Sequence, residues 1–199
     1  ALVFLPVVAA RVLGGRPALV QRGAELASPV AQAPVSVLAY GVAAVRATFE
    51  AHWVVPVHDE PGYRIPNMLD AACAGTFRGM YIQGEDIAQS DPNTKHVEAA
   101  LTAMDCVVVQ DLFLNETAKF AHVFLPGTSF LEKDGTFINA ERRINRVRPV
   151  MKPQTGMAEW EVTQALANAM GYPMEYQSAA EIMDEIAALT PSFAGVSFG

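Results

Sequence analysis

Three short apolar runs, separated by stretches of helical character, constrain the fold of this 199-residue chain more than any other feature. The runs occupy residues 80–83, 106–109 and 122–125. The first gap holds four apolar residues that share one face of a helix, and the second holds the short helical segment NETAKFA. The four are Val97, Ala100, Leu101 and Met104. Strands joined by helical crossovers run parallel, so the sequence predicts an α/β fold with a parallel sheet.

The rest of the chain divides into segments of different character. Residues 40–130 are expected to form one α/β domain with the sheet, beginning with a helical pattern at 42–53. Residues 131–199 are expected to form a hairpin and helical segment of an adjoining domain. Residues 1–39 contain four prolines and no clear periodicity, so they are left unassigned, with atypical composition.

Local patterns predict further elements on both sides of the sheet. A short helix is expected over 67–77, capped by Asn67 and stopped near Gly75. Alternating residues at 136–139 and 143–147 predict the hairpin. Helices are expected at 158–170, ended by Gly171, and at 178–189, opened by a capping box of Ser178 and Glu181.

The entry to the hairpin carries two more specific expectations. Asp134 and Gly135 are expected to form a tight turn, because glycine tolerates positive φ. Glu132 is expected to pair across the hairpin with Arg142 or Arg143.

The composition excludes several classes of partner. With 51% hydrophobic residues the chain has enough apolar surface for a sizeable core. A net charge of −7 without a long basic run argues against nucleic acid and anionic membranes. No uncharged apolar stretch approaches the roughly 18 residues of a spanning helix, so no membrane span is expected. Cys73 and Cys106 form no CxxC and are interpreted as buried small hydrophobic residues, and no metal ligand is assigned.

Polar residues follow each of the three apolar runs. They are Gly84-Glu85-Asp86, Gln110-Asp111 and Gly127-Thr128-Ser129. Ligands of open parallel sheets bind outside the carboxyl ends of the strands. Asp86, Gln110 and Asp111 are therefore expected to converge at one sheet edge, with Ser90 close by. Carboxylates accept hydrogen bonds, so they match ribose hydroxyls or the N1–H and N2–H₂ donors of guanine, whereas they repel bare phosphates.

A structural interpretation competes with this one at each cluster. Acids and amides after a strand commonly cap the next helix or form a turn, without any ligand. Neither GxGxxG nor GxxxxGK[ST] occurs in the chain, which disfavours an ordinary NAD or ATP site.

Specific segments carry a family resemblance that runs from about residue 40 to the C-terminus. YIQGEDIAQSDPNTKHVEAAL, VVVQDLFLNETAKFAHVFLPGTSFLEKDGTFINAERRINRVRPVM and the later AEWEV resemble the molybdopterin oxidoreductase family. The resemblance is closest to catalytic (alpha) subunits of NAD-dependent formate dehydrogenases. It implies that residues 40–130 are the C-terminal part of a domain that binds molybdopterin guanine dinucleotide, and that the chain is a fragment of a longer subunit.

The resemblance also implies cofactors and partners. Such enzymes interconvert formate and carbon dioxide at molybdenum or tungsten held by two molybdopterin guanine dinucleotides, near a [4Fe-4S] cluster. Electrons pass to NAD through iron–sulfur and flavin subunits, which with the remainder of the catalytic subunit are the expected partners. A cytoplasmic location is expected. The cluster cysteines and the metal ligand have no match in this chain, so the fragment alone is expected to be inactive.

Six residues match positions that contact the guanine dinucleotide in the family. They are Asp86, Ser90, Gln110, Asp111, Gly127 and Glu159. Gly127 offers only its backbone where relatives carry Ser or Thr, and Glu159 is longer than the Asp found in some. No catalytic residue is assigned within this chain.

Two alternatives from other classes stay open. The first is a non-catalytic homologue, such as the large iron–sulfur subunit of respiratory NADH dehydrogenase, which keeps the fold without the metal. The retained GED, VVQD and EKDGT segments argue against it. The second is a small free-standing nucleotide-binding module, which a neighbouring coding region for the missing N-terminal part would exclude.

Overall fold

The computed structural model describes residues 43–57, 62–141 and 143–199, which form two compact units. In the first unit the described residues are 62–127, and in the second they are 43–57, 128–141 and 143–199. The segment 1–39, left unassigned above, lies outside the described residues. The units divide after Gly127, and the helix near residue 50 groups with the second unit. The assignment of 40–130 and 131–199 to separate domains stays a prediction.

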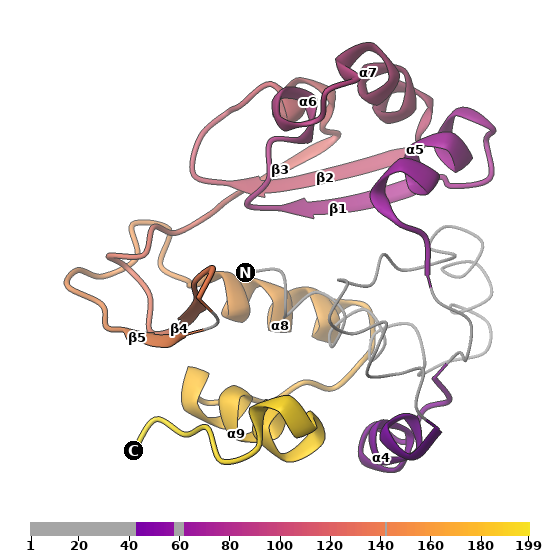
Figure 1. The fold of residues 1–199 in the computed structure, drawn as a ribbon. Coiled ribbons are helices and arrows are strands. Elements are labelled where there is room, and N and C mark those ends of the chain that lie inside the picture. The colour runs from indigo at the N-terminus through magenta and orange to yellow at the C-terminus, as the bar shows by residue number, and fades with distance from the viewer. Residues whose placement is uncertain (1–42, 58–61, 142) are drawn as a thin grey trace. The chain divides into compact units, whose positions relative to one another are not determined.

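A three-stranded parallel sheet forms the centre of the first unit (Figure 1). Its strands are β1 (Gly79–Gln83), β2 (Cys106–Asp111) and β3 (Val123–Pro126), in the order β1-β2-β3. Gln83 pairs with Gln110, and Asp111 pairs with Pro126, so the carboxyl ends of the strands reach the same edge. The parallel α/β arrangement expected from the sequence is confirmed.

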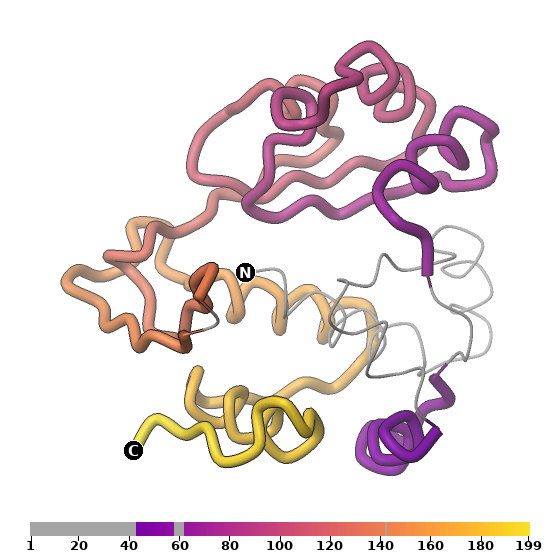
Figure 2. Tube along the Cα trace, viewed as in Figure 1, coloured from indigo at the N-terminus to yellow at the C-terminus, as the bar shows by residue number. Residues whose placement is uncertain are grey.

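Helices cover one face of this sheet, and the tube in Figure 2 traces the crossovers between its strands. They are α5 (Ile65–Cys73), α6 (Ile87–Ser90), α7 (Thr94–Ala103) and the 3₁₀ helix η1 (Thr117–Phe120). The predicted apolar stripe along α7 is buried against Ile82, Val107 and Val109. Strand residues on one face and helix residues at 3.6-residue spacing therefore meet in one core, and burial of their apolar surface stabilises the unit.

Helix α5 begins earlier than its predicted cap. Arg64 is the N-cap residue, and Asn67 lies inside the helix. The reason is Pro66, whose fixed φ suits the first turn of a helix. The helix therefore starts at Ile65, two residues before Asn67. The C-terminus agrees with the prediction, because Gly75 takes φ +76° and donates its amide to the Ala72 carbonyl at 2.9 Å.

The second unit combines a hairpin with helices. Its described elements are α4 (Ala43–Trp53), β4 (Gly135–Ile138), β5 (Ile144–Val147), α8 (Glu159–Ala169), α9 (Ala179–Leu189) and the 3₁₀ helix η2 (Pro191–Phe193). Strands β4 and β5 pair antiparallel, with Phe137 opposite Asn145. The predicted hairpin and both helices after it are confirmed. Ser178 caps α9 by accepting from the Glu181 amide at 3.3 Å, as the capping-box pattern predicted.

The entry to the hairpin differs from the prediction. Gly135 is the first residue of β4 rather than part of a tight turn. Glu132 does not pair with Arg143; instead it accepts from the Ser129 and Gln154 amides. The bidentate pair is Asp134 with Arg146, at 2.9 and 2.8 Å, because the guanidinium fork of β5 fits the carboxylate that directly precedes β4. Arg142 lies outside the described residues.

Two further observations bear on the sequence-based expectations. Cys73 and Cys106 are both exposed, so their interpretation as buried hydrophobic residues is wrong. Cys73 is the last residue of α5 and lies next to the helix face that packs against the core, not on it. Cys106 is the first residue of β2, outside the core cluster. Among the described residues, no helix has the length and apolar character needed to cross a membrane.

Candidate functional site

The loops that leave the three strands are joined to one another at the carboxyl edge of the sheet. The Gly84 amide donates to the Gln110 carbonyl at 2.9 Å, and the Gly127 amide donates to the Asp111 carbonyl at 2.8 Å. A side chain at Gly127 would be tight, because an added Cβ would lie 3.1 Å from the Asp111 carbonyl carbon. The polar clusters that are far apart in the sequence therefore meet at one edge, as the parallel register requires.

Asp86 binds the loop after β2. Its Oδ1 accepts from the Thr117 hydroxyl at 2.6 Å and from the Thr117 amide at 2.9 Å. The Thr117 hydroxyl in turn accepts from the Ala88 amide at 3.0 Å, and Thr117 is fully buried. Desolvation raises the pKa of Asp86, but the Thr117 bonds, the Glu116 amide and the Lys119 charge outweigh it, so this pKa lies below its ordinary value. Asp86 thus anchors η1 to the end of β1.

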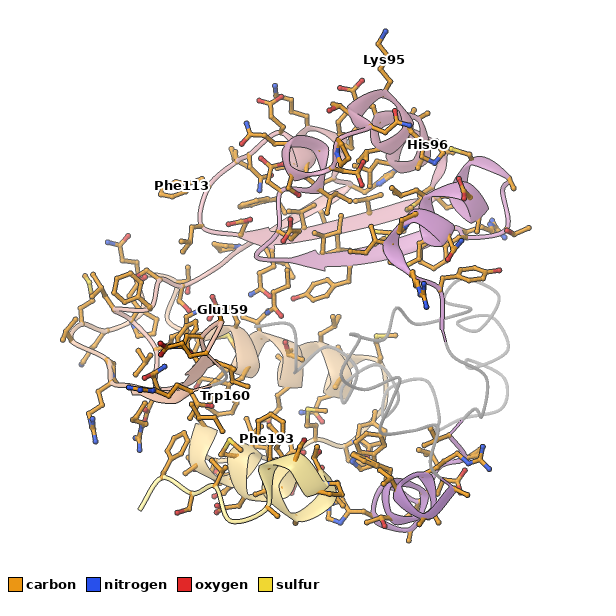
Figure 3. The ribbon with its side chains drawn as sticks, in the orientation of Figure 1. Lys95, His96, Phe113, Glu159, Trp160 and Phe193 are labelled. Atoms are coloured by element: carbon orange, nitrogen blue, oxygen red, sulfur yellow. The ribbon has the colours of Figure 1, made fainter. Side chains whose placement is uncertain are left out.

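Asp111 organises the loop that follows β2. Its carboxylate accepts from the Leu112 amide at 2.6 Å and from the Asn115 side-chain amide at 2.9 Å. The same Asn115 accepts from the Ala118 amide at 2.9 Å, which links this turn to η1. The loop leaves Phe113 75% exposed, and Figure 3 shows its ring directed away from the sheet.

Gln110 is buried at 1% exposure on the sheet face opposite the helices. Its Oε1 accepts from the Tyr81 hydroxyl and, at 2.9 Å, from the side-chain amide of Gln83. Two donors on one oxygen fix the orientation of the side-chain amide. Its nitrogen is buried and has no partner among the described residues.

The three residues expected to act together share an edge but not a face. Successive side chains of a strand leave opposite faces, so Gln110 and Asp111 diverge. Asp111 shares the face of Val109, which packs under the helices, and Asp86 bonds to η1 on that same side. The expectation of one convergent set is therefore wrong: the two acids lie on the helical side and the amide on the other.

Ser90 lies near Asp86, as expected. Its amide donates to the Asp86 carbonyl at 2.8 Å, within the short helix α6. Its hydroxyl donates to Glu85 Oε1 at 2.6 Å, and the residue is exposed.

Glu159 belongs to the second unit, at the start of α8. It accepts from the Thr128 amide at 3.0 Å and the Thr128 hydroxyl at 2.5 Å, and it pairs with Lys133 at 2.8 Å. Desolvation raises the pKa of Glu159, but the bonds from Lys133 and Thr128 outweigh it and lower the pKa. A carboxylate in the first turn of a helix also interacts favourably with the helix dipole.

The sequence did not predict which residues are hydrogen-bonded to these predicted site residues. Thr117 and Thr128 are buried polar residues bonded to predicted site acids, and Tyr81 orients Gln110. A sequence signal existed for Asn115, because it opens the predicted helical segment NETAKFA, and Asn is a common capping residue at the start of a helix.

The fold and this edge define a class of protein: parallel α/β units whose polar strand ends lie together at one edge of the sheet. Residues 11–169 match one family, described as molybdopterin oxidoreductase. The chain belongs to the molybdopterin oxidoreductase family. The match includes most of segment 1–39, which the sequence analysis left unassigned.

Curated relatives support the same family. "Probable oxidoreductase YjgC" of Bacillus subtilis is 41% identical over 155 residues, covering 77% of this chain and 16% of that protein. "Putative formate dehydrogenase SAB2186c" of Staphylococcus aureus and "Putative formate dehydrogenase SH0748" of Staphylococcus haemolyticus are each 43% identical, with the same coverage. The chain thus spans about one sixth of the length of these relatives.

One solved structure shows the fold at a greater distance. The acetylene hydratase from Pelobacter acetylenicus superposes with a TM-score of 0.56 at 20% identity, covering 79% of this chain and 23% of that one. At this identity the likeness concerns the fold alone.

Proposed function

We propose that this chain is part of the catalytic subunit of a formate dehydrogenase, and that the carboxyl edge of its sheet holds the guanine dinucleotide end of a molybdopterin cofactor. The observation that carries the proposal is the edge itself, where three strand-end loops with acids and amides are tied together by the Gly84 and Gly127 amides. Relatives with 43% identity bear the name "Putative formate dehydrogenase", which supports formate and carbon dioxide as substrates.

The hydrogen-bonding groups at the edge fit a guanine nucleotide. Each oxygen of Asp111 accepts one internal bond, which leaves acceptor capacity for a ligand donor. The buried Gln110 amide nitrogen is a donor without a partner among the described residues, but it lies on the face opposite Asp111, so the proposed guanine contact rests on Asp111. Glu85, Asp86 and Glu116 add negative charge, so the edge suits a base or a ribose better than the phosphates.

The six predicted contacts divide by their internal bonding. Asp111 keeps acceptor capacity for a ligand, Gln110 has an amide nitrogen on the opposite face that is unpaired within the described part of the chain, and Gly127 offers only its backbone. Asp86, Ser90 and Glu159 already bond within the chain, so we propose that they shape the loops around the cofactor as well as contact it. When bound, the cofactor would supply the molybdenum or tungsten centre that takes two electrons from formate.

The remaining parts of the proposal concern the longer protein. Iron–sulfur cluster ligands and the metal ligand would come from the rest of the subunit, and flavin and iron–sulfur subunits would carry electrons to NAD in the cytoplasm. This chain would fix the cofactor in place rather than handle the proton or the electrons.

Cofactor retention in the full-length subunit tests the proposal. A hydrogen bond to a charged group contributes about 1.5–3 kcal/mol, and Asp111→Asn removes that charge, so molybdenum or tungsten occupancy should fall about tenfold under competition for cofactor. The rate per bound metal should stay unchanged. Glu98→Gln, an exposed acid on α7, is the matched control and should keep full occupancy.

Asn115→Ala separates a structural role of Asp111 from a ligand role. It removes the internal partner of Asp111 while leaving the carboxylate able to bind a ligand. Full occupancy in Asp111→Asn, or equal losses in Asn115→Ala and Asp111→Asn, would contradict the cofactor contact. A full-length wild-type protein without bound metal would instead support the non-catalytic homologue.

A further inference from the structure

A thiol, an imidazole and a carboxylate form a row on the surface of the first unit, away from the carboxyl edge. Cys73 and Asp70 lie on α5, and His96 lies in the first turn of α7. The Cys73 Sγ is 3.9 Å from His96 Nδ1, and His96 Nε2 is 3.0 Å from Asp70 Oδ1. Packing of α5 on α7 through Leu69, Ala72 and Val97 sets this arrangement.

The chemistry of the three groups fixes the direction of the row. A carboxylate only accepts hydrogen bonds, so His96 Nε2 carries the proton that it shares with Asp70. In the neutral ring the other nitrogen, Nδ1, is then an acceptor and faces the Cys73 thiol. A nucleophile beside a base that a third group orients is the arrangement that activates thiols in enzymes.

The exposure of the thiol determines which reagents can reach it. Cys73 is exposed, and the His96 side chain is 32% exposed, so small reagents reach both. Among the described residues no set of three or more His, Cys, Asp or Glu side chains is arranged to hold a metal ion. The row suits proton transfer from the thiol, because the acceptor nitrogen of His96 faces the Cys73 sulfur and Asp70 orients the ring.

We propose that Cys73 is a thiol-modification site, at which His96 and Asp70 promote mixed-disulfide formation with a low-molecular-weight disulfide. This proposal is independent of the cofactor site. His96 takes the thiol proton at Nδ1, while its Nε2–H stays bonded to Asp70. The Cys73 thiolate attacks one sulfur of the disulfide, a new S–S bond forms, and the old S–S bond breaks. The leaving thiolate takes the proton from Nδ1. Cys73 is oxidised, and the released thiol is the reduced product.

Cys106 is a built-in reference for this reaction. It is a free, exposed cysteine in the same unit, and no described His or acid is hydrogen-bonded to its sulfur. Trypsin places Cys73 and Cys106 in separate peptides, residues 65–78 and 96–119. Their modification can therefore be followed in one sample of the full-length, reduced protein by mass spectrometry.

The experiment exposes that protein to oxidised glutathione and measures the initial rate at each site. Cys73 should react at least about tenfold faster than Cys106. His96→Gln should lower the Cys73 rate to that of Cys106 and leave Cys106 unchanged. Asp70→Asn should slow Cys73 by about two- to threefold, because the exposed carboxylate orients the base but does not take the proton.

Lys95→Gln is the matched control, because it removes a neighbouring positive charge without removing the base. Lys95 is exposed and directed away from the protein in Figure 3, whereas His96 bonds toward α5. Its Cys73 rate should equal that of the wild type. Equal rates at Cys73 and Cys106 in the wild-type protein would overturn the proposal without any variant. So would an unchanged Cys73 rate in His96→Gln, or an equal slowing in Lys95→Gln.

Discussion

Both units contain the same local device, in which a carboxylate holds a buried threonine by its amide and its hydroxyl. In the first unit Asp86 holds Thr117, and in the second Glu159 holds Thr128. The difference lies in what surrounds each pair. The first pair sits beside an apolar core, whereas the second adds an ion pair with Lys133. An acid that matches a ligand-binding position can thus also serve the fold.

The units also differ in how much apolar surface they cover. Buried residues of the first unit form one continuous core from two strands and three helices. In the second unit, α4 contributes Phe49 and Trp53 to a smaller cluster, and Trp53 donates to Glu185 at 3.0 Å. Both units also expose large apolar side chains: in the first these include Leu112, Phe113 and Leu114, and in the second Phe130, Val150 and Met170. A parallel sheet under helices closes a core by itself, whereas a hairpin with separate helices does not.

The largest expected effect tests this contrast in packing. Leu101→Ala creates a cavity in the first core and should lower its free energy of unfolding by about 2–5 kcal/mol. Leu166→Ala, at a residue 37% exposed on α8, should cost less than about 1 kcal/mol. Hydrogen exchange of the Val107 and Val109 amides reports on the first unit, and fluorescence of both tryptophans reports on the second. Equal shifts of both signals in Leu101→Ala would mean that the units unfold together.

The two threonines give the next largest effect. Thr117→Val keeps the shape but removes the hydroxyl that bonds Asp86 and Ala88, so the first unit should lose about 1–3 kcal/mol. Thr128→Val should lower the free energy of unfolding of the second unit by less, because Lys133 still neutralises the charge of Glu159. Denaturant unfolding with the same two probes measures both losses. Serine at each position is the control and should restore most of the stability; a neutral Thr117→Val would show that this hydroxyl is not needed.

Acid should weaken both pairs by a smaller amount. The folded-state pKa values of Asp86 and Glu159 are lowered. Their contribution to the free energy of unfolding is therefore fully present above the ordinary carboxyl pKa of about 4. It is lost as the pH falls through the folded-state values, because protonation then accompanies unfolding. Stability measured from about pH 7 to pH 3 should fall, and Glu159→Gln should flatten that fall in the second unit. If the slope of stability against pH in the second unit is unchanged by this substitution, Glu159 is not a source of the acid sensitivity.

The smallest effect is expected at the hairpin surface. Glu141 and Arg143 are both exposed and 3.7 Å apart, so Arg143→Ala should change the free energy of unfolding by less than about 0.5 kcal/mol. Arg146→Ala should cost more, because it removes a bidentate bond to Asp134 and the stacking of Arg146 over the Phe198 ring at 3.8 Å. Thermal unfolding of the two variants side by side checks this order, and a reversed order would contradict it.

Sequence patterns were sufficient for the strands, the longer helices and their order, but not for the short helices α6 and η2. Apolar runs at 80–83, 106–109 and 122–125 became β1, β2 and β3, and the stripe on α7 became part of the core. These features are local, because the spacing of apolar residues selects strand or helix and helical crossovers force parallel pairing. The same rule placed the polar clusters at one edge, and the sequence segments themselves carried the family.

Only the tertiary structure decided what each polar side chain bonds to. Asp86 meets Thr117, 31 residues later, and Glu159 meets Thr128. Gln110 and Asp111 diverge to opposite faces, and Cys73 lies exposed beside His96. Hydrogen bonds act over about 3 Å and depend on direction, so they follow from the packing of segments that are far apart in sequence. Apolar burial is non-directional and roughly proportional to area, which is why a periodic sequence alone determines it.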